Sequence, residues 1–516
     1  MSQETKHSSS SSSSFGLWLP AMASAAAAAV ARMVNEAVSL LVFIVLDLLD
    51  ALLCFVYKMA DYVMEEECKP CYCSSSSDDD DDVILVAENG GSKLLSLTSS
   101  ASFDDTKLHL EDISDTLFLR PCLLADLAKT ALHDLRKLKL VSSAASSSSS
   151  SAASSSAAAT FTTNSTIVRV LRGKVGRARG KAAARTSSRS WTDCACESCN
   201  HWSSPSGERD ALFVHVEGPK GEKVAEEDVV FIHGFLSSSK FWTETVFPNV
   251  SEAAKSRYRL LAVDLLGFGR SPKPPESLYT LREHVEMIES SVLQRFQVKS
   301  FHIVAHSLGS ILALALAVKY PGAVKSLTLL APPYFPVPKG EHGTHYVLRR
   351  VAPRRVWPLM AFGASVLCWY EHISRVASLV LCKNHRRWES AFKFVTRNRI
   401  RTYLMDGFFC HTHNASWHTF HNIICGAGAG KVEAYLEAVA ERLSCDVVVF
   451  HGRDDELLPV DCSYAVKSKV PRTRVVVVDR KDHLTIVVGR QKAFAGELED
   501  IWEKANKCCK ETEKHD

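Results

Sequence analysis

Six short apolar runs between residues 229 and 480 constrain the fold of this 516-residue chain more than any other feature. Each run is rich in valine, isoleucine, leucine or phenylalanine, and helix-forming stretches separate successive runs. Nearly continuous apolar runs are typical of strands that are buried on both faces of a parallel sheet. The pattern therefore predicts an α/β fold with a mostly parallel sheet flanked by helices. The expected strands are VVFIHG (229–234), RLLAVDL (259–265), FHIVAHS (301–307), SLTLLAP (326–332), DVVVFHG (446–452) and RVVVVDR (474–480).

The third run passes through Ser307 directly into an apolar, helix-forming stretch. A nucleophile elbow needs this context, because its sharp strand-to-helix turn lifts a hydroxyl above the sheet. The usual elbow reads Gly-x-Ser-x-Gly, and here Ala305 takes the place of the first glycine while Gly309 keeps the second. The helix N-terminus also favours developing negative charge. We therefore predict that Ser307 is a catalytic nucleophile rather than part of a structural turn.

A serine nucleophile requires a base to take its proton and a carboxylate to orient that base. In the α/β-hydrolase fold these partners follow the serine in the order acid, then histidine. Residues 452–459 match the loop pattern Gly-x-x-Asp-x-x-x-Pro at Asp455, which favours Asp455 over Asp454 as the acid. His483 follows the last apolar run and is the predicted base.

The first apolar run leads into the loop His233-Gly234-Phe235. In this fold the corresponding loop donates one backbone N–H to the oxyanion hole, and the residue after the nucleophile donates the other. The predicted donors are therefore Phe235 and Leu308, with His233 in a structural role at the base of the loop.

An insertion over about 331–444 precedes the strand that carries the acid. Its many aromatic and leucine residues predict a helical cap that forms a wall of the site and suits an apolar acyl chain. Four of its histidines raise the alternative of a metal site, but no carboxylate or cysteine completes a ligand set. We therefore expect neither a metal nor a cofactor. The four histidines are His411, His413, His418 and His421.

The N-terminal part contains a Ser/Ala-rich extension (1–36) and an apolar helix (37–66) that is long enough to cross a membrane. Asp47 and Asp50 weaken a spanning interpretation, although their spacing places both on one helix face. The alternatives are a membrane anchor, an amphipathic helix on a membrane or on the domain, and a cleaved signal with its core at 15–31. Membrane association is favoured in general.

Residues 67–190 contain a cysteine cluster, the helical spacing of 108–140 and a Ser/Ala linker at 142–159. The hydrolase domain is predicted at 191–506 and a tail at 507–516. Disulfides, acylation and metal binding all remain open for the cysteines. The clustered cysteines fall in two groups, Cys68, Cys71 and Cys73 in this region and Cys194, Cys196 and Cys199 just after it.

The net charge of +3 gives no reason to expect nucleic acid as a partner, and the oligomeric state is not predicted.

With these residues placed, the chain resembles the plant BODYGUARD family of α/β-hydrolases over nearly its whole length from Ala37. The family pattern matches at Ser307, Asp455 and His483, whereas the Ser/Ala tracts before Ala37 and at 142–159 depart from it. The resemblance is carried by HGFLSSSKFWTETVFPN (233–249), RLLAVDLLGFGRSPKP (259–274), FHIVAHSLGSILALALAVKYPGAVKSLTLLAPPY (301–334), FGASVLCWYEHISR (362–375), HTHNASWHT (411–419) and DHLTIVVGRQKAFA (482–495).

The resemblance implies a lysophospholipase-like serine hydrolase of lipid or hydroxy-fatty-acid esters that acts in cutin and cuticle formation at the plant epidermis. It also implies passage through the secretory pathway to the plasma membrane or cell wall. Two alternatives stay open: an acyltransferase that uses the same triad, and a non-catalytic ligand-binding protein on the hydrolase fold. Epoxide or haloalkane chemistry would need a carboxylate nucleophile, and Ser307 argues against it.

Overall fold

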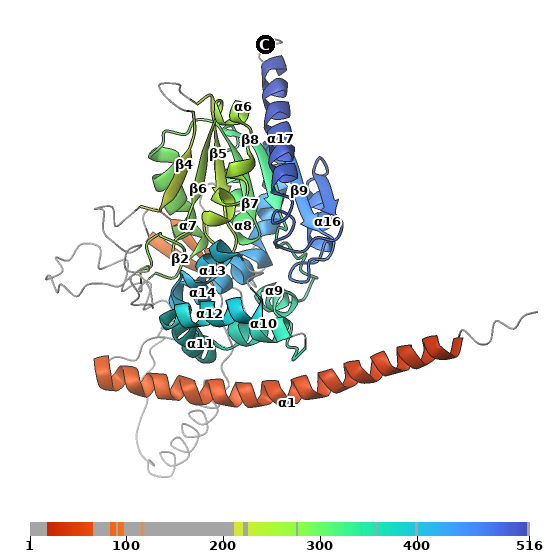
Figure 1. Ribbon diagram of the computed structural model, residues 1–516. Coiled ribbons are helices and arrows are strands. Elements are labelled where there is room, and N and C mark those ends of the chain that lie inside the picture. Colours follow the sequence, from red (N-terminus) through yellow and green to blue (C-terminus); the bar gives the residue numbers. More distant parts are fainter. Residues whose placement is uncertain are drawn as a thin grey trace, which may run out of the picture.

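A seven-stranded sheet forms the centre of the region from residue 211 to residue 512 in the computed structural model (Figure 1). The structure describes residues 18–65, 83–88, 91–96, 115–117, 211–219, 225–274, 277–341, 343–357, 359–397 and 401–512. The strand order is β10-β9-β8-β7-β5-β6-β4, and all neighbours are parallel except β4, which is antiparallel to β6. The strands are β4 (Val214–Glu217), β5 (Glu227–Ile232), β6 (Tyr258–Val263), β7 (Phe301–His306), β8 (Val324–Leu330), β9 (Asp446–Gly452) and β10 (Arg474–Val478).

The mostly parallel α/β sheet predicted from the sequence is confirmed, and each of the six expected strands is present. The edge strand β4 was not predicted. It is only four residues long and is partly exposed, so it lacks the continuous apolar run that marks the buried strands.

Helices cover both faces of the sheet. Phe231 of β5 faces Trp502 of α17, with 6.3 Å between ring centroids, whereas the next residue, Ile232, faces Gly309 of α8. Successive strand side chains point to opposite faces, so α8 and α17 lie on opposite sides. The helices around the sheet, outside the insertion described next, are α5 (Lys240–Thr243), η2 (Phe247–Asn249), α6 (Glu252–Lys255), α7 (Leu281–Ile288), η3 (Glu289–Gln294), α8 (Leu308–Lys319), α15 (Lys431–Arg442), α16 (Asp461–Lys469) and α17 (Gln491–Thr512).

A helical insertion between β8 and α15 lies over the carboxyl ends of the strands (Figure 1). It is tied to the loops there: the Asn422 side chain donates to the Leu278 carbonyl at 2.7 Å, and Lys240 pairs with Asp406 at 2.8 Å. The helical insertion consists of α9 (Gly343–Val351), α10 (Leu359–Trp369), α11 (Glu371–Lys383), α12 (His385–Val395), α13 (Thr402–Phe409), α14 (His413–Thr419), η4 (Phe420–Gly426) and η5 (Ala427–Ala429).

The apolar segment near the N-terminus forms one long helix, α1 (Trp18–Glu65), which runs along the outer side of the insertion (Figure 1). The helix begins further upstream than the predicted 37, because the alanine-rich sequence before it strongly favours helix. By length and composition, its segment Val30–Tyr57 is able to cross a membrane.

A small antiparallel sheet in the upstream region has the order β2-β1-β3. Its strands are β1 (Val83–Glu88), β2 (Gly91–Ser96) and β3 (Asp115–Leu117). The helix predicted within 108–140 is therefore wrong at β3, where pairing with β1 overrides the local apolar spacing. The rest of that stretch, both cysteine clusters and the Ser/Ala linker lie outside the described residues.

Candidate active site

The predicted site residues follow the carboxyl ends of four strands in the same sheet. The loop of Phe235 follows β5, Ser307 follows β7, Asp455 follows β9, and His483 follows β10. Because these strands are parallel, their carboxyl ends meet at one edge, where α/β proteins place their ligands. The fold thus brings residues that are up to 248 positions apart to one edge of the sheet.

Ser307 occupies a strained turn between β7 and α8. Its backbone φ is 51° and ψ is −122°, a conformation that is uncommon for a residue other than glycine. At this turn the loop after β5 approaches the start of α8 closely, since a Cβ at Gly309 would lie 2.7 Å from the His233 carbonyl oxygen. Ala305, in contrast, is accommodated as a fully buried residue of β7. The geometry has the features of a nucleophile elbow.

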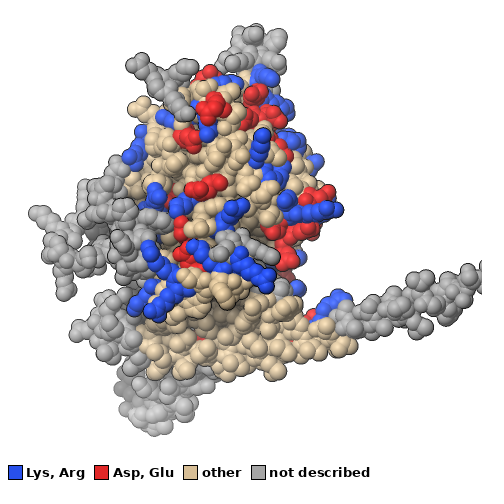
Figure 2. All heavy atoms as spheres, viewed as in Figure 1, with Lys and Arg blue, Asp and Glu red and all other residues tan. Residues whose placement is uncertain are grey.

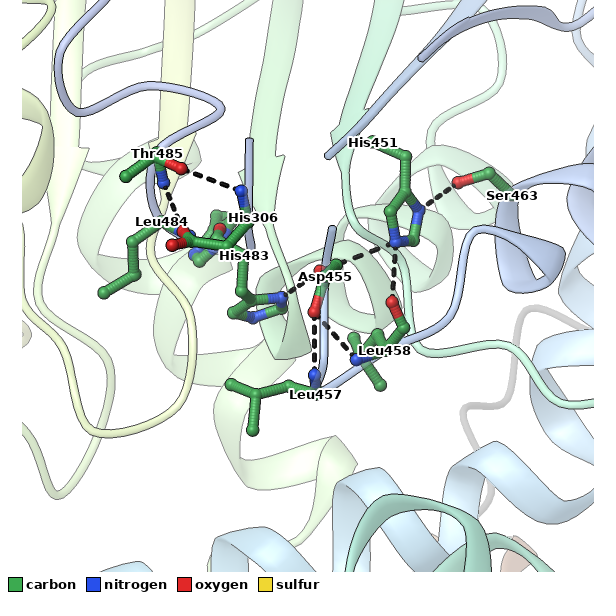
Figure 3. Close-up of polar contacts among 10 residues, drawn as sticks. His306, His451, Asp455, Leu457, Leu458, Ser463, His483, Leu484 and Thr485 are labelled. Carbon is green, nitrogen blue, oxygen red and sulfur yellow. Dashed lines mark hydrogen bonds and ion pairs between the residues drawn. The ribbon is translucent and has the colours of Figure 1, made fainter. Parts of the chain in front are cut away.

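Asp455 and His483 form a close pair at this edge (Figure 3). The distance from Asp455 Oδ2 to His483 Nδ1 is 2.7 Å, and the two side chains are 0% and 12% exposed. The other carboxylate oxygen accepts backbone N–H groups from Leu457 and Leu458, both at 2.9 Å. Asp454, the alternative acid, is exposed and makes no described contact with His483.

Burial alone would raise the pKa of Asp455, but hydrogen bonds from His451 and His483 outweigh burial and hold this pKa well below its ordinary value. The carboxylate is therefore ionised throughout the neutral pH range. An ionised acceptor fixes the proton of His483 on Nδ1 and leaves Nε2 available as a base.

His451, at the end of β9, supports the same carboxylate and was not predicted. Its Nε2 faces two acceptors, the Leu458 carbonyl at 2.8 Å and Asp455 Oδ2 at 3.5 Å, so this nitrogen carries the proton (Figure 3). Nδ1 then accepts from the Ser463 hydroxyl at 2.5 Å. The sequence places His451 four residues before Asp455 at a strand end, which was a signal that could have been used. The sequence does not say, however, toward which group the His451 side chain points.

His306, next to the candidate nucleophile, was also not predicted. Its Nε2 donates to the backbone carbonyl of His483 at 2.9 Å, and its ring stacks on Phe241 at 5.1 Å between centroids. Burial, and then the neighbouring His483, lower the pKa of His306 to about 3. The neutral ring therefore holds the loop of His483 by a hydrogen bond that does not change with protonation near neutral pH.

The loop after β5 lies directly against Ser307. A Cβ at Gly234 would lie 3.1 Å from Ser307 Cβ, and Leu236 has a φ of 50°. His233 Nδ1 donates to the Gly234 carbonyl at 2.7 Å while its Nε2 accepts the Leu265 N–H at 3.0 Å. Both ring nitrogens of His233 are thus engaged in holding the loop.

Comparison with known proteins identifies the relatives of this chain. Residues 229–357 match the family described as alpha/beta hydrolase fold. The chain is 55% identical over 484 residues to "Probable lysophospholipase BODYGUARD 1" of Arabidopsis thaliana, covering 92% of this chain and 97% of that protein. The chain belongs to the BODYGUARD family. BODYGUARD 2 and BODYGUARD 3 of the same plant are 53% and 52% identical, cover 92% of this chain, and are themselves covered to 99% and 97%.

Two histidines of the insertion, His421 and His411, have separate partners in this BODYGUARD-family chain. His421 lies between the carbonyl oxygens of Trp417 and Cys368, at 2.9 and 2.8 Å, and His411 Nδ1 lies 3.6 Å from the Cys382 sulfur. Within the part of the chain that the structure describes, no three His, Cys, Asp or Glu side chains gather as metal ligands.

Proposed function

We propose that this protein is a serine hydrolase of lipid acyl esters, with Ser307 as nucleophile, His483 as general base and Asp455 as the orienting acid. The observation that carries the proposal is the 2.7 Å contact between Asp455 and His483 at the same sheet edge as the strained Ser307 turn. An acid–histidine pair placed beside an elbow serine is the arrangement that acyl transfer requires.

In the proposed reaction, His483 Nε2 takes the proton of the Ser307 hydroxyl as its oxygen attacks the ester carbonyl carbon. The negative charge of the tetrahedral intermediate is held by the backbone N–H groups of Phe235 and Leu308. His483 returns the proton to the leaving alcohol as the C–O bond breaks. Water, deprotonated by His483, then attacks the acyl-enzyme, and the fatty acid leaves as the Ser307 hydroxyl re-forms.

The lipid substrate is supported by two observations. The insertion above the strand ends contributes Phe420, whose ring lies 5.6 Å from Phe235, so that the loop beside Ser307 has apolar surroundings. The relatives carry the printed name lysophospholipase. We further propose, from the family resemblance, a role in cutin and cuticle formation after passage through the secretory pathway, with residence at the plasma membrane or cell wall.

The test uses the full chain, its Ser307→Ala variant and the control Ser310→Ala, which alters a buried serine one helical turn away. We expect a fluorophosphonate probe to label the parent and the control in a saturable manner and to leave Ser307→Ala unlabelled. Equal labelling of Ser307→Ala, or no labelling of a folded parent, would refute the proposal.

Product analysis then defines the reaction. With lysophosphatidylcholine and hydroxy-fatty-acid esters as substrates, release of free acid identifies a hydrolase. Formation of longer esters in the presence of a hydroxylated acceptor identifies an acyltransferase that uses the same residues. Covalent labelling without turnover of any lipid ester favours a ligand-binding protein.

A further inference from the structure

One face of α1 is matched to the helical insertion. Ser39, Phe43, Asp47, Asp50 and Cys54 follow one another at intervals of three or four residues and so share one face of the helix. All of them are buried except Asp47, which is partly exposed. The residues that interrupt an otherwise apolar segment are therefore the ones that face the protein.

Asp50 binds the N-terminus of α11 as a capping residue supplied by another helix. Its Oδ1 accepts the backbone N–H groups of His372 and Ile373 at 3.0 and 3.1 Å, and its Oδ2 lies 3.5 Å from His372 Nδ1. The first N–H groups of a helix have no partner within the helix, and a negative charge there is favourable. The contact thus satisfies a buried carboxylate and the start of α11 together.

Further contacts extend this match along α1. The guanidinium of Arg354 lies 3.3 Å from Asp47 and 5.7 Å from the Phe43 ring centroid. Tyr370 donates its hydroxyl to the Phe43 carbonyl at 3.2 Å, and the Val356 N–H donates to the Ser39 hydroxyl at 3.1 Å. Both aspartates of the segment therefore have partners in the insertion, and neither points outward.

The opposite face of α1 is exposed and purely apolar between residues 37 and 57. Figure 2 shows a broad surface without charged side chains along α1 and the adjoining insertion. The exposed large apolar residues of this face are Val38, Leu40, Leu41, Ile44, Val45, Leu48, Leu49, Leu52, Phe55 and Val56. An apolar surface of this extent marks an interaction site.

The insertion continues the same surface and adds basic residues at its margin. Trp357 and Leu359, which are 71% and 70% exposed, follow the Val356 contact with α1. On α12, exposed Arg386 and Arg387 precede Phe394, which is 86% exposed. Figure 2 shows Lys and Arg side chains gathered above the uncharged surface. Apolar residues bordered by cations are typical of proteins that bind anionic membrane surfaces.

We propose that α1 and the helical insertion form one membrane-binding face, in which α1 lies in the plane of an anionic bilayer and does not cross it. The proposal rests on the membrane association included above and specifies its geometry. A spanning helix would have to pull Asp47 and Asp50 from their partners into hydrocarbon, where carboxylates without partners are strongly unfavourable. An in-plane helix keeps both contacts and inserts only its apolar face, about 5–10 Å deep.

This geometry also places the candidate active site relative to the lipid. The insertion lies between α1 and the carboxyl ends of the strands (Figure 1). The membrane-binding face and Ser307 are therefore both at the end of the sheet that is formed by the carboxyl ends of its strands. A lipid ester that leaves the bilayer would therefore reach the strand ends by way of the insertion.

The topology test uses the full chain in sealed microsomes, with one epitope tag at each terminus. The in-plane geometry predicts that both termini lie on the same side, so external protease removes both tags or neither. Removal of one tag with protection of the other would show that α1 crosses the membrane. Absence of the N-terminal tag, together with an intact mass of the membrane-bound chain that lacks residues 37–57, would show that the membrane-binding part of the helix is cleaved. Either result overturns the proposal.

The surface test measures flotation of the full chain with vesicles of phosphatidylcholine and phosphatidylserine. We expect Leu41→Glu/Leu48→Glu to lower the bound fraction at least tenfold. Val216→Glu/Tyr464→Glu is the matched control, since both residues are exposed but lie outside this face, on β4 and α16; it should bind like the parent. Equal binding of the two double variants, or a parent that does not float because it forms soluble dimers through α1, contradicts the proposal.

The two proposals are tested separately by these measurements. Hydrolysis of a short, soluble ester should be the same in the parent and Leu41→Glu/Leu48→Glu, because neither leucine lies at the strand ends. A chain that floats but neither reacts with the fluorophosphonate nor cleaves esters would contradict the serine hydrolase and leave the membrane-binding face intact. A chain that cleaves soluble esters but fails to float does the opposite.

Discussion

Two buried Asp–His pairs in this molecule use the same chemistry for different purposes. In each, one carboxylate oxygen accepts two consecutive backbone N–H groups and the other faces the Nδ1 of a histidine. At the strand ends, Asp455 lies 2.7 Å from His483, whereas at the α1 contact Asp50 lies 3.5 Å from His372. The close contact of Asp455 holds the His483 ring in one orientation. The main role of Asp50 is instead to cap the N-terminus of α11, and its contact with the His372 ring is longer.

The difference lies in what surrounds each pair. His451 supports Asp455 from a third side, and His306 holds the backbone of His483, so the catalytic candidate is positioned by two further rings. Asp50 instead joins two helices that are far apart in the chain. We infer that loss of the first carboxylate mainly changes reactivity, while loss of the second mainly changes stability and membrane attachment.

Asp455→Asn tests the first half of this comparison and should have the largest effect. An amide presents the wrong hydrogen-bonding group to His483 and favours the wrong tautomer, so ester hydrolysis should fall about 10⁴-fold. The matched control is Asp454→Asn, an exposed neighbour, which should change the rate by less than about twofold. The measurement is kcat/KM on a soluble ester, and similar losses in both variants would show that the acid is misassigned.

Gly234→Ala tests how tightly the loop after β5 is held against Ser307. The added Cβ would lie 2.9 Å from His306 Nδ1 and 3.1 Å from Ser307 Cβ, so the loop must shift. Displacement of the proposed Phe235 donor should lower kcat about 100-fold. Gly322→Ala adds a methyl group where nothing lies within 4 Å and serves as the control. A full rate in Gly234→Ala argues against this loop as an oxyanion donor.

The free energy of unfolding should depend on pH through His284 in a different pH range from Asp455. Burial lowers the pKa of His284 to about 4, so from pH 6.5 to 5 only the unfolded state takes up this proton. The free energy of unfolding should then fall by about 2 kcal/mol from His284 alone. The lowered pKa of Asp455 adds no change in this window, because its contribution is lost only near and below the unfolded pKa of about 4.

Urea unfolding of the parent and His284→Asn at both pH values measures this contribution. The variant should lose about 2 kcal/mol less than the parent between pH 6.5 and 5. An identical loss in both proteins would mean that His284 is not buried in its neutral form.

Asp50→Ala tests the second half of the comparison and should have the smallest effect. Removal of the cap leaves two N–H groups of α11 without their acceptor, and the free energy of unfolding should fall by about 1–2 kcal/mol. Hydrolysis of a soluble ester should remain unchanged. Asp47→Ala, which removes a partly exposed ion pair with Arg354, is the control and should cost less than about 1 kcal/mol. Equal stability of the two variants would contradict the capping role.

Much of the fold was predictable because its signals are local. Each buried strand is a continuous apolar run, and the sharp turn at Ser307 follows from a strand that passes into a helix through small residues. The same reasoning missed β4, because a short edge strand needs few apolar residues. It predicted a helix across β3, where pairing with a distant strand decides the structure.

The sequence by itself determined the parallel α/β sheet, the strand ends that carry Ser307, Asp455 and His483, and the choice of Asp455 over its neighbour as the predicted acid. Only the tertiary structure decided the partners of His451 and His306 and the side of α1 that faces the protein. The physical reason is sequence distance: Asp50 and the start of α11 are 322 residues apart. The spacing of the two aspartates defines a face, but only packing determines what that face meets.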